Sequence, residues 1–212
     1  PAGGGAEVPK HVAAVKFCSK CGAGVEYRAP PEDVVLRPIC TSCGSVVYLN
    51  PKVVTGAVCL SEDHSRVLLC RRAIPPVGKW TIPAGFLEMD ETTSEGAVRE
   101  AMEEAFAEIS VHPGALIAVY NIPMANVVQH VFAAVIPDEA AARVRPGEET
   151  QEVRFFGWDE LDQAEIAFAT VEWVLEHLRA VMGSGVDVGA VATGMAKSEV
   201  QVRTKKPDGT FV

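Results

Sequence analysis

The chain has 212 residues, 48% of them hydrophobic, and a net charge of −9 at pH 7. This length is enough for one full hydrophobic core with a small accessory module. The acidity argues against a role in coating nucleic acid, which needs a basic face, and no run of 18 apolar residues predicts a membrane span. The chain does not begin with Met, which suggests a processed form without its targeting segment, or a trimmed chain.

The N-terminal part divides into a tail and a cysteine-rich module. Residues 1–14 are small and weakly patterned, which predicts a flexible tail, whereas residues 15–50 carry two C-x2-C pairs separated by 18 residues. The four cysteines are Cys18, Cys21, Cys40 and Cys43. A glycine, Gly22 or Gly44, follows each pair and allows the chain to leave the tight turn. This spacing predicts a structural four-thiolate zinc site without an open position, and the alternative is a disulfide framework.

Residues 51–182 alternate between strand and helix patterns. The apolar runs that predict strands are Val53–Leu60, Arg66–Arg72, Ala115–Ile122, Val127–Ile136 and Val153–Trp158. One helix is expected after Thr92 and a second over Thr170–Val181, with a charged loop over Pro137–Thr150. Strands on both sides of a central helix, with a second helix late in the chain, predict an α/β/α sandwich.

The acidity of the chain is mostly local. Eight carboxylates and a single arginine, Arg99, fall between Glu88 and Glu108. Thr92 and Glu95 fit a capping box that would begin a helix here. Three carboxylates of this helix share one face: Glu100, Glu103 and Glu104. Like charges at this spacing repel, and a hard cation that prefers oxygen ligands, usually Mg²⁺, would remove the penalty.

This stretch resembles the Nudix box, G-x5-E-x7-R-E-U-x-E-E-x-G-U, in which U is aliphatic. The matching residues are Gly85, Glu91, Arg99, Glu100, Ala101, Glu103 and Glu104. Phe106 stands where the second glycine belongs. A left-handed phenylalanine would cost about 1–2 kcal/mol, so we expect Phe106 to stay helical and buried. The resemblance implies a Nudix sandwich with a mixed sheet, and hydrolysis of a diphosphate with Mg²⁺ or Mn²⁺.

The resemblance extends to a branch of the family. A four-cysteine ribbon joined to the box through Tyr48-Leu49-Asn50-Pro51 is similar to the plant and algal chloroplast FAD pyrophosphohydrolases and related bacterial enzymes. This similarity covers roughly residues 16–180 and implies cleavage of FAD to FMN and AMP, or of ADP-ribose, in the plastid stroma. The NADH-pyrophosphatase branch also carries a zinc ribbon but has an S-Q-P-W motif downstream of its box. Specificity for NADH is therefore less favoured here, because this chain has Tyr120-Asn121-Ile122-Pro123 and no such motif.

The family pattern also implies roles for individual residues. The implied Mg²⁺ ligands are Glu100, Glu103, Glu104 and the Ala84 carbonyl. The general base is left open among these three glutamates and the loop acids Glu148, Glu149 and Glu152. Arg99 and Glu91 are expected to pair and fix the loop against the helix, which makes them orienting residues of the catalytic group.

Four further residues are candidates for substrate binding. Arg71 and Arg72 end a strand near the box and could contact phosphate, although exposed strand-end charges explain them equally well. Phe86 and Trp80 could stack on a base, although core packing is the default role for such side chains.

Three functions compete at this point. The first is a dinucleotide pyrophosphohydrolase, which the four box glutamates favour. The second is a weakened Nudix-fold scaffold or regulatory subunit of a larger complex, favoured by Phe106, by Asp90 in place of a small residue, and by the extra C-terminus. The third is an RNA-end hydrolase, which the acidic surface disfavours. The resemblance also allows a homodimer.

Residues 183–212 lie beyond the resemblance. Four glycines, Gly183, Gly185, Gly189 and Gly194, oppose a stable helix, and the segment is basic. A disordered appendage is expected for this segment alone. The alternative is that Glu199–Lys205, with its alternating pattern, adds as an edge strand or docks in extended form on another protein.

Overall fold

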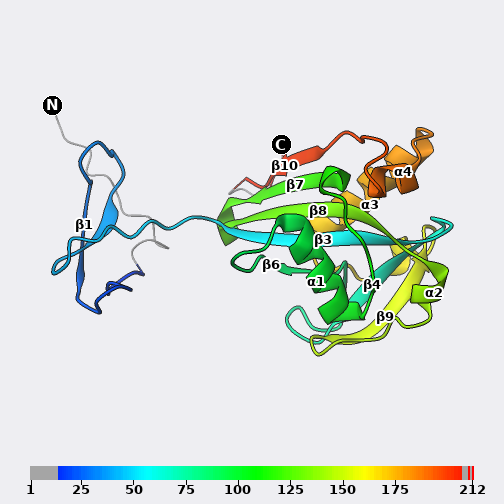
Figure 1. Ribbon diagram of the computed structural model, residues 1–212, viewed down its shortest axis with the longest axis horizontal. Helices are drawn as coiled ribbons and strands as arrows, with labels where there is room; N and C mark the ends of the chain where they lie inside the picture. The colour runs from blue at the N-terminus through cyan, green and yellow to red at the C-terminus, as the bar shows by residue number, and fades with distance from the viewer. Residues whose placement is uncertain (1–13, 207–209, 211) are drawn as a thin grey trace. The chain divides into compact units, whose positions relative to one another are not determined.

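The computed structural model describes residues 14–206, 210 and 212, so nearly all of the tail predicted for residues 1–14 lies outside the described part. The chain divides into two compact units, residues 1–50 and 51–212 (Figure 1). No helix among the described residues is long and apolar enough to cross a membrane.

The first unit is built on one small hairpin. Strand β1 (Val25–Arg28) pairs antiparallel with β2 (Arg37–Cys40). At each C-x2-C turn a glycine takes the left-handed conformation, with φ of 74° at Gly22 and 70° at Gly44. The buried apolar residues described here are few, namely Cys18, Pro30, Pro38, Ile39 and Cys40. Such a small interior does not stabilise a fold by itself, so this unit depends on its cysteines.

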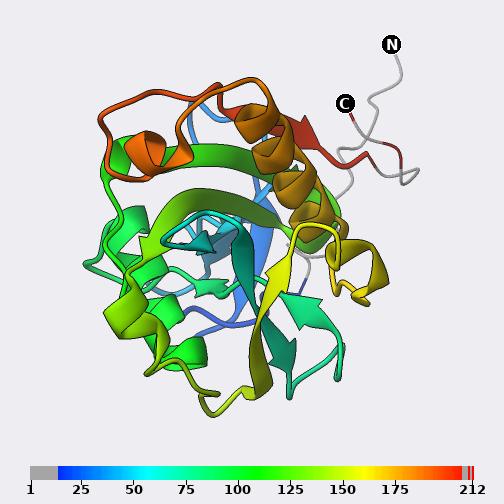
Figure 2. The same cartoon turned by 90° about the vertical axis from the view of Figure 1, so that its right-hand side faces the viewer.

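The second unit contains one eight-stranded mixed sheet (Figure 2). Its strands are β3 (Lys52–Ser61), β4 (Arg66–Arg72), β5 (Trp80–Thr81), β6 (Ala84–Phe86), β7 (Leu116–Ile122), β8 (Val127–Ile136), β9 (Thr150–Gly157) and β10 (Gln201–Thr204). Their order is β10-β7-β8-β3-β4-β5, with β6 paired to β3 and β9 to β4. The β3–β8 and β10–β7 pairs are parallel and the others are antiparallel, which confirms the mixed sheet.

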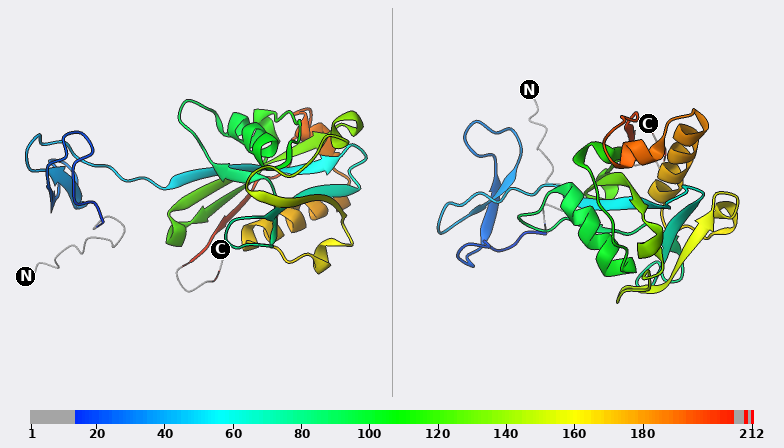
Figure 3. Two further views of the ribbon diagram at one scale, coloured as in Figure 1. Left: turned by 90° about the horizontal axis from the view of Figure 1, so that it is seen from below. Right: turned by 45° about the vertical axis from the view of Figure 1, so that its right-hand side comes forward.

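Helices cover both faces of this sheet. They are α1 (Thr93–Ala105), α2 (Asp138–Ala141), α3 (Ala169–Gly183) and α4 (Val188–Ala192), and single 3₁₀ turns lie at Pro113–Ala115, Pro123–Ala125 and Leu161–Gln163. Helices α1 and α3 lie on opposite faces of the sheet (Figure 3). The predicted α/β/α sandwich is therefore confirmed. The short α2 lies inside the predicted loop Pro137–Thr150, because four residues are too few to give a periodic signal.

Phe106 corrects a prediction. It ends α1 in the left-handed conformation, with φ 48° and ψ 32°, and is half-buried instead of helical and fully buried. Its N–H donates to the Met102 carbonyl at 3.0 Å, and the Ala107 N–H reaches the Ala101 carbonyl at 3.1 Å. The Arg145 guanidinium stacks 3.6 Å from the centre of the Phe106 ring. This cation–π contact offsets part of the cost of the conformation.

A later loop completes this helix end. The N–H groups of Arg145 and Gly147 donate to the carbonyls of Ala105 and Glu104, both at 3.0 Å. A Cβ on Gly147 would lie 1.7 Å from the Glu103 carbonyl oxygen, so only glycine permits this approach. The loop thus provides hydrogen-bond donors for the last carbonyls of α1. A longer α1 would prevent these hydrogen bonds.

The C-terminal segment is not a disordered appendage. Helix α4 forms although a stable helix was not expected, because Asp187 caps its N-terminus by accepting from the Gly189 N–H at 2.9 Å. Its residues Val188 and Val191 are 2% and 1% exposed and belong to the same buried cluster as the apolar side chains of α3. Tertiary packing therefore overrides the low helix propensity of a glycine-rich segment.

The strand expected within Glu199–Lys205 is present as β10, at the edge of the sheet of its own domain. It pairs in parallel with β7, and Tyr120 Oη donates to Gln201 Oε1 at 2.5 Å. On the outer side, Thr204 and Val212 exchange two backbone hydrogen bonds of 2.8 and 3.2 Å. The segment is thus an integral part of the second unit, and no other chain is needed to order it.

Truncating one side chain of α4 tests this integration. Val191→Ala should lower the free energy of unfolding by about 2 kcal/mol, because it leaves a cavity in the core. Val202→Ala is the matched control, since Val202 lies on β10 but is 62% exposed, and its change should stay within about 0.5 kcal/mol. Urea unfolding followed by tryptophan fluorescence measures both. Equal values for the two variants would contradict the packing of α4.

Candidate active site

Helix α1 begins where its sequence dictates. The Glu95 N–H donates to Thr92 Oγ1 at 3.2 Å, and the Thr92 N–H donates to Glu95 Oε2 at 2.7 Å. This reciprocal pair is the predicted capping box, and it starts the helix at Thr93. The helix start in turn fixes which residues of the next three turns face the loop at Gly85.

Arg99 and Glu91 pair as the resemblance implies. The guanidinium donates to both Glu91 oxygens, at 2.7 and 3.1 Å, and also to the Phe86 carbonyl at 3.0 Å. Glu91 in addition accepts from the Glu88 N–H at 2.8 Å. The hydrogen bonds from Arg99 hold the pKa of Glu91 below its usual value. This bidentate pair ties the loop after β6 to the helix.

The other end of the same guanidinium holds two more carboxylates. Arg99 Nη1 donates to Glu100 at 2.7 Å and to Glu103 at 2.9 Å. Glu100 is 8% exposed and approaches the backbone at Gly85, where a Cβ would lie 2.4 Å from its carboxylate oxygen. Glycine at position 85 is therefore a steric requirement of the buried carboxylate.

The third glutamate of this face is the most strongly perturbed. Glu104 accepts from the Ala84 N–H at 3.1 Å, and burial raises the pKa of Glu104 to about 7. Burial also raises the pKa of Glu100. Both shifts mean that these oxygens lack an opposite charge strong enough to offset their lost hydration.

This donor set fits a hard divalent cation. Carboxylate oxygens are the ligands that Mg²⁺ and Mn²⁺ take, and all three glutamates of α1 line the same cavity. Glu100, Glu103 and Glu104 would hold the cation. The contact that Ala84 makes is through its N–H, so the carbonyl ligand stays a prediction.

A cavity of about 1100 Å³ opens beside these glutamates. Its acidic lining consists of Glu88, Glu100, Glu103, Glu104, Glu148 and Glu149. Glu152, the remaining candidate base, lies outside this lining and pairs with Arg71 at 3.6 Å. The candidate bases in the loop are thereby reduced to Glu148 and Glu149.

The candidate substrate-binding residues separate into two groups. Arg72 and Phe86 line the cavity, and Phe86 is 51% exposed. Arg71 instead donates to the Gly78 carbonyl at 3.0 Å, and Trp80 packs edge-on against Phe156, with ring centres 4.8 Å apart. Arg71 and Trp80 therefore have structural contacts outside the cavity.

Sequence reasoning missed much of this lining, including Phe168, Trp173 and Lys205. The Arg72 guanidinium lies 5.0 Å from the centre of the Phe168 ring, and Arg72 Nε is buried without a hydrogen-bond partner among the described residues. No local motif marks these positions, because they come from α3 and from the segment after β10, far along the chain from the box.

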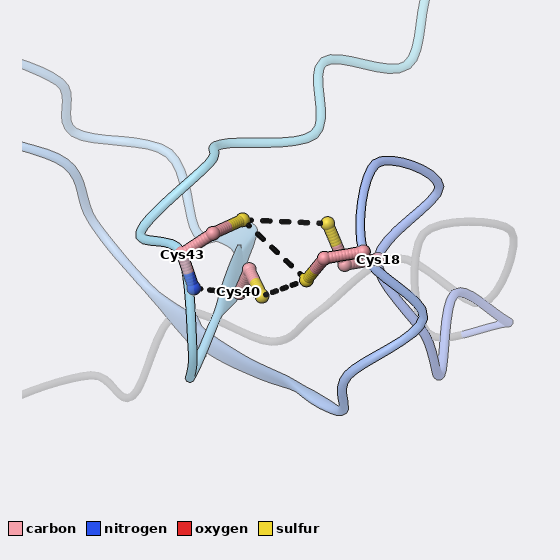
Figure 4. Close-up of side chains that lie close together, drawn as sticks. Cys18, Cys40 and Cys43 are labelled. Atoms are coloured by element: carbon pink, nitrogen blue, oxygen red, sulfur yellow. Dashed lines mark hydrogen bonds between the residues drawn. The ribbon is translucent and has the colours of Figure 1, made fainter.

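The four cysteines of the first unit converge on one point (Figure 4). Their sulfurs all lie within 4.8 Å of one another, with the measured pairs at 3.4, 3.6 and 3.8 Å. Zinc with four sulfur ligands would set these edges at about 3.8 Å. Hydrogen bonds with Ser45 lower the pKa of Cys43 to about 6, which favours a thiolate. The arrangement fits a closed structural zinc site.

Comparison with known proteins matches the two units to two parts of one family. The NUDIX domain family matches residues 50–176, and the Nudix N-terminal zinc ribbon family matches residues 16–49. The chain belongs to the Nudix family of pyrophosphohydrolases. As a family member it retains all four box glutamates, and it departs from the box at Phe106.

Individual Nudix proteins resemble the chain to different extents. The crystal structure of a NUDIX hydrolase from Nitrosomonas europaea is 39% identical, covers 90% of this chain and 99% of that chain, and has a TM-score of 0.71. An ADP-ribose pyrophosphatase of Methanocaldococcus jannaschii is 29% identical over 63% of this chain and 76% of its own length. An NAD-capped RNA hydrolase NudC of Salmonella heidelberg is 28% identical over 49% of this chain, which spans only 38% of that relative.

Replacing one cysteine tests the zinc site. The purified protein should hold one zinc ion, and Cys40→Ser should lose it, because three thiolates leave the shell open. Cys59→Ala is the matched control, since Cys59 is a fully buried thiol of β3 in the other unit and should leave the zinc content unchanged. Elemental analysis measures both. A disulfide between any two of the four cysteines would contradict the prediction.

The raised pKa of Glu104 predicts an unusual dependence of stability on pH. A carboxyl with a pKa near 7 when folded and near 4.5 when unfolded destabilises the folded state as pH rises between these values. In magnesium-free buffer at pH 8, Glu104→Gln should therefore be more stable than the wild type, by on the order of 2 kcal/mol. The gain should shrink towards pH 4.5. Urea unfolding at several pH values measures it, and a gain independent of pH would refute the cause.

Proposed function

We propose that this protein hydrolyses the diphosphate of a nucleoside diphosphate linked to another group, with Mg²⁺ or Mn²⁺ as cofactor. The observation that supports it best is that Glu100, Glu103 and Glu104, from one helix, all line a cavity large enough for a dinucleotide. A bound cation there would polarise a phosphoryl oxygen and acidify an attacking water.

The residues of the chain then have distinct tasks. Arg99 lines the cavity but holds Glu91, Glu100 and Glu103 in place, so we assign it the role of orienting the ligands. Arg72 is the lining arginine suited to a phosphate, because its Nε is buried without a partner among the described residues. Glu148 and Glu149 face the same cavity from the loop and are the bases available beside the box glutamates.

ADP-ribose and FAD are the substrates we propose. ADP-ribose is supported by the named activity of the Methanocaldococcus relative. FAD is supported by the resemblance of the ribbon and box to FAD pyrophosphohydrolases. Cleavage of the P–O–P bond by water would give AMP with ribose 5-phosphate, or AMP with FMN.

The scaffold alternative loses its main support. It was favoured by Phe106, which could have lengthened α1 and displaced the glutamates. The helix instead ends at Ala105, and the loop residues that receive it leave Glu103 and Glu104 in the cavity lining. The C-terminal segment is likewise accounted for by packing within the second unit.

The homodimer and a dock for another protein stay predictions, as does the plastid location, which rests on the resemblance alone. Sedimentation of the full chain would measure its oligomeric state.

Hydrolysis of ADP-ribose and FAD with and without Mg²⁺ tests the proposal. The wild type should release AMP from at least one substrate, and Glu104→Gln should lower kcat by at least about 100-fold, since it removes a ligand of the cofactor. Glu108→Gln is the matched control, because Glu108 follows α1 but is exposed and pairs with Arg143. Metal-independent turnover, or equal rates for the two variants, would overturn the assignment.

A further inference from the structure

The segment after β10 forms part of the substrate cavity. Lys205 follows β10 directly, is half-buried, and lines the cavity. Its backbone N–H donates to the Asn121 carbonyl at 3.0 Å, which continues the parallel pairing of β10 with β7. Upstream, His177 Nε2 on α3 lies 3.0 Å from the Glu199 carbonyl oxygen. The backbone of Lys205 is thus held against the sheet, and the segment that precedes β10 is held against α3.

Lys205 lies far from the glutamate cluster. The strands that separate them run in the order β6, β3, β8, β7 and β10, and strands in a sheet are about 4.8 Å apart, so β6 and β10 are about 19 Å apart. A lysine side chain does not bridge this distance. Lys205 therefore serves a part of the substrate other than the diphosphate held at the box.

The surroundings of Lys205 differ from the acidic end. The lining residues nearest in the sheet are apolar, with Ile122 at the end of β7 and Val127 at the start of β8. Trp173 faces the cavity from α3, and its ring packs edge-on against Tyr120, with centres 5.5 Å apart. The Arg203 guanidinium lies 5.2 Å from the centre of the same ring. The cations of Lys205 and Arg203 and the Trp173 ring thus lie at the β10 end of the sheet, away from the carboxylates of α1.

We propose that Lys205 binds a phosphate monoester that the substrate carries away from its scissile diphosphate. This inference rests on the proposed function and narrows its substrate class to nucleotide derivatives with a third, peripheral phosphate. A lysine in the lining of a cavity favours a compact anion, and phosphate is the anion that nucleotides supply. Trp173 offers a ring face for the adjoining sugar or base.

Paired substrates test the inference. ADP-ribose and 2′-phospho-ADP-ribose differ only by the peripheral phosphate, and the wild type should have the lower KM for the phosphorylated form. Lys205→Ala should raise the KM for the phosphorylated form about tenfold relative to that for ADP-ribose, and Lys205→Arg should restore most of the preference. Lys206→Ala is the matched control, because Lys206 is the next residue but is exposed and outside the cavity lining.

The outcomes separate the inference from the function on which it rests. An equal rise in KM for both substrates would place Lys205 at the scissile diphosphate and overturn the inference, as would no change in either. If the wild type hydrolyses neither compound, the proposed function is what has failed. Titration calorimetry of 2′-phospho-ADP-ribose with wild type and Lys205→Ala then decides the inference alone, since equal dissociation constants would refute it.

Discussion

Mutual repulsion among carboxylates is the constraint on which the site depends. One guanidinium, that of Arg99, bonds to three of them and to a backbone carbonyl of the loop. It neutralises only part of their charge, because Glu104 lies beyond its reach and is protonated readily. The cluster therefore stays poised for a cation, and the protein bears that electrostatic cost in its folded state. Glycine at position 85 and the capping box at Thr92 are the local features that hold the carboxylates together in spite of it.

The end of α1 shows how a substitution in a motif can be absorbed. Phe106 adopts the backbone conformation that the family's glycine would take, and Arg145 stacks on its ring. Gly147 lets the loop approach the helix end, where the loop N–H groups donate to the last carbonyls of the helix. Glycine is therefore absent at position 106, where the helix ends, but is required at position 147 in the loop that caps the helix. The same loop carries Glu148 and Glu149 into the cavity, so the substitution and the site are linked through one short segment.

Local patterns in the sequence predicted the features that depend on neighbouring residues. The strands at Arg66–Arg72 and Val127–Ile136 have the predicted bounds, and the Arg99–Glu91 pair and the cysteine cluster are present. The main failures, apart from the short α2, involve contacts between distant segments. Phe106 depends on Arg145, and α4 depends on a buried cluster that it shares with α3 and with strands as early as β3. The cavity wall at Lys205 could not be predicted either, because nothing in a basic, glycine-rich segment indicates parallel pairing with β7.

The placement of β10 has a consequence for how the protein folds. Tyr120 and Gln201, which join the two strands, are separated by 81 residues, and β10 is the last of the described elements to emerge during synthesis. Closing so long a loop late makes this pairing a non-local step with a slow entropic search. Until it closes, β7 presents an open edge that can pair with other nascent chains. Completion of the cavity and protection of that edge are therefore the same folding event.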